Sequence, residues 1–95
     1  MYRVMVDDNF HYMDEEERFE HGSFATAEEA IAACKRIVDE DLAQYFKPGM
    51  IAAALYEMYT SFGDDPFVVG DPDDPRIAFS AWDYAKDRAN EMCAK

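Results

Sequence analysis

The chain has 95 residues and a formal net charge of -12, yet 49% of its residues are hydrophobic and 15% are aromatic. Disordered acidic chains lack aromatic and aliphatic residues, so this composition predicts a compact domain with an acidic surface. The charge argues against direct nucleic-acid binding, because phosphate contacts need clustered Lys and Arg. The length is that of one small domain, so we expect residues 1–95 to form a single domain.

The sequence shows no pattern typical of export or of a membrane span. Residues 1–8 form a strand pattern without the basic and apolar regions of a signal peptide. No apolar run approaches the roughly 20 residues that a membrane helix needs. We therefore expect a cytoplasmic protein that does not bind membranes. Cys34 and Cys93 lie outside any Cys-x-x-Cys pair and away from His, so we expect two reduced thiols and no metal or cofactor.

The first part of the chain predicts a β-hairpin. Residues 2–12 alternate between an apolar and a more polar face, which is typical of a half-buried strand. Residues 13–16 are polar and suit a turn, and residues 17–24 then return as a second strand. Gly22 interrupts the alternation of this second strand and indicates a bulge.

The position of the turn predicts the register of the hairpin. If the chain turns symmetrically about residues 14–15, Phe10 faces Phe19 and Asp8 faces His21. An aromatic pair at Phe10 and Phe19 would stabilise the hairpin across its strands.

Two helices carry clear start signals. The capping box from Thr26 to Glu29 predicts a helix that begins at residue 27, and its apolar stripe continues to about Phe46. Ser80 with Asp83 three residues later predicts the start of a final helix.

Another helix is predicted to begin between Pro48 and Met50 and to end at Gly63. It is apolar most of the way round. Such a helix is either central in its fold or covered by a partner, so we expect a protein–protein interface and a homodimer. The candidate interface residues are Ile51, Tyr56, Met58 and Tyr59.

Residues 63–75 are punctuated by Pro and Gly and predict a loop, with short strands at 67–69 and 76–79 as further options. Together the elements predict an α+β fold: an N-terminal antiparallel hairpin, with or without a third short strand, and about three helices packed on one face. Because a two-stranded sheet is marginal alone, either the late segment supplies a third strand or two chains pair their sheets.

Three blocks of the chain, Asp7–Glu15, Gly22–Phe24 and Phe79–Ala85, resemble a set of small, acidic, uncharacterised bacterial proteins. No activity is established for that set, so the resemblance implies no mechanism.

Several polar residues are candidates for chemistry. Asp8 facing His21 would form a carboxylate–imidazole pair suited to acid–base catalysis, or else a polar pair that holds the register. His11 lies among the acids of the hairpin tip, where it would bind a ligand or a divalent metal, although no spacing matches a recognised metal site. The acids of residues 64–74 lack the spacing of a calcium loop, which favours simple Asp-Pro turns.

Three functions are open on the sequence. The leading one is a non-catalytic protein-interaction or regulatory domain that forms a homodimer. The second is an acidic mimic or inhibitor of a basic nucleic-acid-binding protein, because residues 7–20 hold seven acids against one base and residues 64–74 add five acids. The third is a small enzyme or ligand binder that uses Asp8, His21 and His11.

Overall fold

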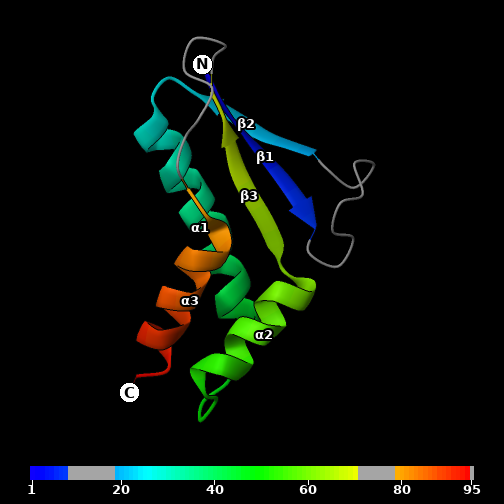
Figure 1. Cartoon of the computed structure of the whole chain (residues 1–95), viewed down its shortest axis with the longest axis vertical. Coiled ribbons are helices and arrows are strands. Elements are labelled where there is room, and N and C mark those ends of the chain that lie inside the picture. The colour runs from blue at the N-terminus through cyan, green and yellow to red at the C-terminus, as the bar shows by residue number, and fades with distance from the viewer. Residues whose placement is uncertain (9–18, 71–78, 95) are drawn as a thin grey trace.

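The computed structural model describes residues 1–8, 19–70 and 79–94. In this part of the chain, three strands and three helices form an elongated α+β fold (Figure 1). The predicted fold class, with its N-terminal hairpin, third strand and three helices, is confirmed. In chain order the elements are β1 (Tyr2–Asp8), β2 (Phe19–Phe24), α1 (Ala27–Tyr45), α2 (Ala52–Phe62), β3 (Asp64–Val69) and α3 (Ala81–Met92).

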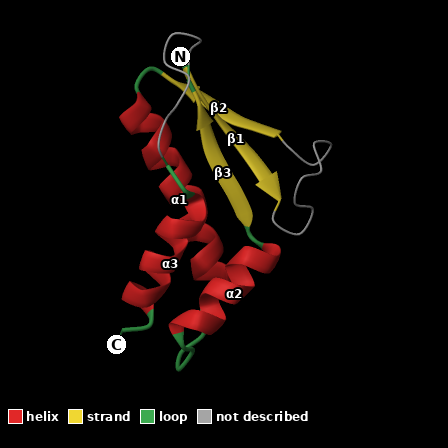
Figure 2. Cartoon of the chain, viewed as in Figure 1, coloured by secondary structure: helices red, strands yellow, loops and turns green. Residues whose placement is uncertain are grey.

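The sheet has the order β2-β1-β3, and β1 is antiparallel to both neighbours. The helices lie to one side of it (Figure 2). Val4 and Val6 point toward the helices from the central strand and are fully buried, while Arg3 and Met5 belong to the opposite face. A two-stranded hairpin alone is only marginally stable in water. The third strand and the helices that cover one face remove this deficit.

The hairpin register differs from the predicted one. Phe19 is paired with Val6 rather than with Phe10, and Phe10 lies outside the described residues. The pairing shifts between Val4 and Met5, and His21 is the extra residue at this irregularity, next to Gly22, where a bulge was predicted. Strand β1 is also paired with β3 along most of its length. The register of β1 with β2 is therefore fixed by the side chains that face the core, and not by the shortest turn that could connect the two strands.

Both predicted helix caps are confirmed. The Thr26 hydroxyl accepts a hydrogen bond from the backbone N–H of Glu29 at 3.1 Å and begins α1. The Ser80 hydroxyl accepts one from the N–H of Asp83 at 3.2 Å and begins α3. Each cap satisfies one of the N–H groups that a helix start leaves without an intrahelical partner.

The second helix starts later than predicted. Gly49 has a φ of 85°, in the left-handed region that favours glycine, and the N–H of Met50 donates to the carbonyl of Lys47 at 3.1 Å. Residues 47–50 therefore form a turn, and α2 begins at Ala52.

The strand that was an option at residues 67–69 is present and longer than expected, and it replaces the first part of the loop predicted at residues 63–75. Strand β3 runs from Asp64 to Val69, with Pro66 and Val68 buried on the face that meets α1. Proline is tolerated because β3 is the edge strand of the described sheet, where it pairs with β1 and needs no second ladder of hydrogen bonds.

Helix α1 belongs to two hydrophobic clusters. Its first half packs on the sheet and its second half packs against α2 and α3, while Phe79 contacts both clusters. The sheet cluster contains Val4, Val6, Ala30, Ala33, Cys34 and Val68. The helical cluster contains Val38, Leu42, Leu55, Tyr59, Ala81, Ala85 and Ala89.

A polar network also joins α3 to α1. The Tyr84 hydroxyl donates to the two carboxylate oxygens of Asp39 at 2.9 and 3.1 Å. Arg88 donates from Nε to Asp39 at 3.1 Å and from Nη1 to Glu91 at 2.7 Å. The Lys35 ammonium lies 5.5 Å from the centre of the Tyr84 ring. The network holds the two helices in one register along their contact.

Replacing Tyr84 tests this network. Burial and the hydrogen bond to Asp39 raise the pKa of Tyr84 to about 12. Its contribution to stability is therefore present below pH ~10 and lost as the pH rises toward ~12. We expect Tyr84→Phe to lower the free energy of unfolding by about 1 kcal/mol at neutral pH, with a smaller difference from wild type in alkali. Urea unfolding at both pH values measures this, and an equal difference at the two would contradict it.

Candidate functional site

The structure does not bring Asp8 and His21 together as strand partners. Asp8 is paired with Asp64 of β3, on the far side of β1 from β2. His21 is exposed at the irregularity opposite Val4 and Met5. The facing of Asp8 and His21 depended on the predicted register, which was wrong because the strands pair four residues further back.

The ligand or metal site predicted at His11 stays a prediction. His11 lies outside the described residues. Within residues 1–8, 19–70 and 79–94, no three His, Cys, Asp or Glu side chains are grouped to hold a metal ion.

The two cysteines are unpaired and differ in environment. Cys34 is fully buried between α1 and the sheet, and burial, with a smaller effect from Asp65, raises the pKa of its thiol to about 11. Cys93 is half-buried at the end of α3. Since the thiolate is the reactive form, Cys34 is unsuited to nucleophilic chemistry at neutral pH.

We expect one of the two thiols to react with a disulfide reagent in the folded protein. Cys93 should react fast, and Cys34 only at the rate of unfolding, because it is both inaccessible and protonated. Counting the released thiols with and without urea checks this, and Cys93→Ser should remove the fast phase. Rapid reaction of Cys34 in the folded variant would contradict the assigned burial.

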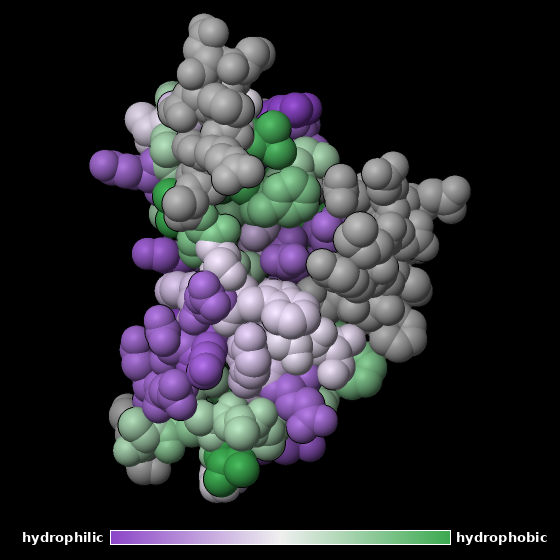
Figure 3. All heavy atoms as spheres, viewed as in Figure 1, coloured by the Kyte–Doolittle hydropathy of each residue, from purple (hydrophilic) through white to green (hydrophobic). Residues whose placement is uncertain are grey.

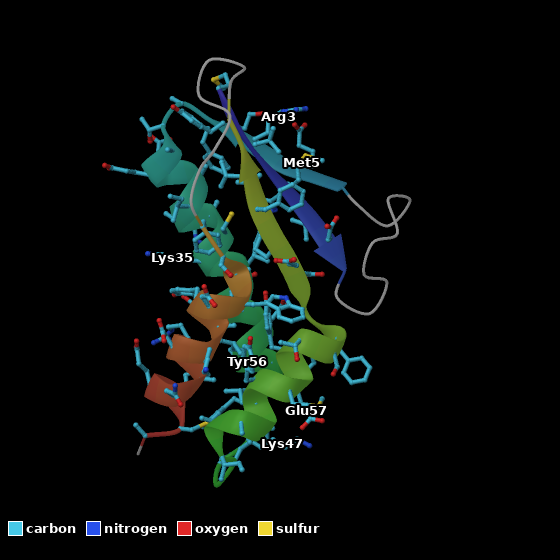
Figure 4. The ribbon with its side chains drawn as sticks, in the orientation of Figure 1. Arg3, Met5, Lys35, Lys47, Tyr56 and Glu57 are labelled. Carbon is cyan, nitrogen blue, oxygen red and sulfur yellow. The ribbon has the colours of Figure 1, made fainter. Side chains whose placement is uncertain are left out.

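Helix α2 is a peripheral amphipathic helix. Leu55 and Tyr59 are fully buried, so Tyr59 is not available to a partner. Tyr56 is half-buried on the side that faces α3, whereas Glu57 points away from it (Figure 4).

Three large apolar side chains on α2 remain in solvent. Ile51, Met58 and Phe62 are 69%, 36% and 51% exposed. Met58 and Phe62, four residues apart, lie on one side of α2, and Ile51 is the residue that caps the start of the helix. We call these three residues the apolar flank of α2; the sequence had singled out Ile51 and Met58 but not Phe62.

A tight joint connects α2 to β3. The Tyr59 hydroxyl donates to the carbonyl of Asp64 at 2.5 Å, and the N–H of Asp64 donates to a carboxylate oxygen of Asp41 at 2.8 Å. A Cβ on Gly63 would lie 2.7 Å from the Tyr59 ring, so only glycine fits between them. The joint fixes where β3 begins and so places Asp65.

Asp65 borders a hollow of about 480 Å³ where α2, β3 and the start of α3 meet. We call it the α2–β3–α3 hollow. The face drawn in Figure 3 shows hydrophilic atoms beside pale, weakly polar residues at this level of the molecule. Its aromatic and acidic lining residues are Tyr56, Asp65, Phe67, Phe79, Trp82 and Asp83.

The carboxylate of Asp65 lies in an environment that disfavours its ionised form. Burial, and then repulsion from Asp7 directly across on β1, raise its pKa to about 6. The protonated form is therefore favoured by the fold, and ionisation at neutral pH leaves a partly desolvated negative charge.

Removing this charge should stabilise the protein. The folded pKa of Asp65 lies above its unfolded value, so its contribution is present below pH ~4 and lost as the pH rises through ~6. We expect Asp65→Asn to change the free energy of unfolding more favourably at pH ~7 than at pH ~4. The difference between its effects at the two pH values should be about 1 kcal/mol, after allowance for solvent screening of the charge. Urea unfolding at both pH values measures this. Asp87→Asn, at an exposed position on α3, is the control, and equal behaviour of the two variants would contradict the assignment.

A larger hollow of about 1060 Å³ lies at the opposite end of the helices, between the α1–α2 connection and the end of α3. Figure 3 shows strongly hydrophobic atoms at this end of the molecule. Phe46, Met50 and Ile51 contribute to its wall, so it continues the apolar surface of α2. Its arginine, Arg88, is already bound to Asp39 and Glu91, which leaves little chemistry for a polar ligand.

Sequence reasoning missed Asp65, Phe67 and Trp82 as a group. It assigned Asp65 to an acidic loop and Trp82 to the buried stripe of the last helix. The available signal was the alternation of residues 64–69, in which buried Pro66 and Val68 separate residues of the other face.

Comparison of the chain with protein-family models, with curated proteins and with solved structures finds no match. In the described part of the chain, no helix combines the length and the apolar character needed to cross a bilayer.

Proposed function

We propose that the protein is a cytoplasmic, non-catalytic interaction domain that pairs with a second copy of itself through the apolar flank of α2. The observation that carries the proposal is the exposure of Met58 and Phe62 on one side of a single helix, with Ile51 exposed at its start. Exposed apolar side chains that gather in this way are typical of protein interfaces.

Charge favours a second copy as the occupant of this surface. Each chain carries a net charge of -12, so two copies repel one another over most of their surfaces. Helix α2 has a single charged residue, Glu57, among its eleven residues. Two copies therefore meet with the least repulsion at α2, and the apolar wall formed by Phe46 and Met50 extends the contact area.

The acidic-mimic function is less well supported. It requires carboxylates gathered on one face. Those of the described residues occur on all six helices and strands, while seven of the twelve acids in residues 7–20 and 64–74 lie outside the described residues. Such a distribution is typical of a surface that keeps a small protein in solution.

The mass in solution tests self-association. We expect light scattering to give the mass of two chains at low and at high salt, because the contact is apolar. Met58→Glu should shift the mass to one chain by placing a charge in the contact. Ala53→Glu is the matched control, since it adds the same charge to an exposed position on the other side of α2. A wild-type mass of one chain at every concentration would contradict the proposal.

A further inference from the structure

The α2–β3–α3 hollow combines aromatic and acidic groups from three elements. Tyr56 comes from α2, Asp65 and Phe67 from β3, and Trp82 and Asp83 from the first turn of α3. Its volume of about 480 Å³ lies within the range of small-ligand sites, roughly 300–1,000 Å³.

An anion does not fit this lining. Among the described residues that border the hollow, none is a Lys or an Arg. The start of α3 supplies about half a positive charge, which the carboxylates of Asp65 and Asp83 outweigh. The N–H of Asp83 is moreover already bonded to the Ser80 hydroxyl.

A neutral apolar ligand or a bare metal ion fits no better. An apolar ligand would desolvate the Asp65 carboxylate further without giving it a partner. A metal ion needs several oxygen ligands, and the described residues contain no group of three acidic, His or Cys side chains that could hold one. Aromatic rings supply no such ligands.

We propose that the α2–β3–α3 hollow binds the ammonium group of an organic cation, with the Asp65 carboxylate and the Trp82 ring in contact with it. The faces of aromatic rings carry a partial negative charge that attracts cations, and tryptophan does so best. The Trp82 side chain is 39% exposed, so part of its surface is open to solvent. A cation whose surface is partly apolar can contact the carboxylate through its charge and the aromatic rings through its apolar surface at the same time.

Two described carboxylates near Asp65 favour a cation. Asp7 faces it from β1, and Asp83 borders the same hollow from α3. From α1, the Cys34 thiol is uncharged at neutral pH because its pKa is raised to about 11. From α2, the Tyr56 hydroxyl is uncharged as well, since the ordinary pKa of tyrosine lies far above neutral pH and burial and Asp83 raise it further. Burial, and then repulsion from Asp7, hold the pKa of Asp65 near 6, and a bound cation would offset both effects by favouring the ionised carboxylate.

The ammonium group could belong to a free small molecule or to a lysine of a partner protein, and the chemistry of the hollow is the same for both. The site is independent of self-association, because Tyr56 lies toward α3 and the apolar flank lies on another side of α2. Met58→Glu should therefore bind the cation as the wild type does.

Trp82 is the sole tryptophan of the chain, so its fluorescence reports on the hollow directly. We would titrate the protein with choline chloride at constant ionic strength, and in parallel with 3,3-dimethyl-1-butanol, which has the same shape without the charge. We expect a saturable change with choline and at least about tenfold weaker binding of the alcohol.

Variants separate the charge of Asp65 from the shape of the hollow. Asp65→Asn should weaken choline binding about tenfold and leave the alcohol unaffected, while Asp87→Asn should change neither. Lowering the pH from about 7 to about 5 should weaken choline binding to the wild type but not to Asp65→Asn. Circular dichroism of each variant confirms that it remains folded.

A second titration identifies the source of the ammonium group. A short peptide with one lysine is compared with the same peptide carrying glutamine. Tighter binding of the lysine peptide than of choline supports a partner protein, and the reverse supports a free small molecule. The proposal is overturned if choline and the alcohol bind equally, or if neither choline nor the lysine peptide gives a saturable change.

Discussion

The joint at Tyr59, Gly63 and Asp64 is the constraint on which the rest of the structure depends. The Tyr59 ring is fully buried, its hydroxyl holds the carbonyl of Asp64, and Gly63 leaves no Cβ in the way. Because Asp41 of α1 holds the N–H of Asp64, the start of β3 is fixed to both helices. Strand β3 can then pair with β1 in a single register.

Helix α1 connects this joint to both hydrophobic clusters. Its first half covers the sheet and its second half carries α2 and α3, so two clusters that are each small share one rigid element. A domain of this size buries limited apolar surface, and a helix common to both clusters makes their stabilities interdependent. Asp39 adds a polar contact to α3 through Tyr84 and Arg88 at the same level.

The joint also separates two surfaces with different chemistry. On one side of α2, Met58 and Phe62 remain in solvent on a helix with one charge, with Ile51 exposed at its start, which suits contact with another apolar surface. Toward α3, Tyr56 meets Asp65 and Trp82 around a hollow that contains both aromatic and negatively charged groups. The proposed apolar contact and the proposed site for a positive group would thus lie on different sides of α2. The first surface is nearly free of charge, whereas the second contains carboxylates.

The sequence by itself determined the local features: the α+β class, the caps at Thr26 and Ser80, the end of α2 at Gly63 and the bulge beside Gly22. These depend on neighbours a few residues apart, where spacing and side-chain chemistry suffice. Only the tertiary structure decided the hairpin register, the full length of the strand at residues 64–69 and the position of Asp65 and Trp82 on one hollow. Each depends on contacts between distant segments: β1 has two partners to satisfy, and the Tyr59 joint places the acidic segment at the sheet edge, where Pro66 is tolerated.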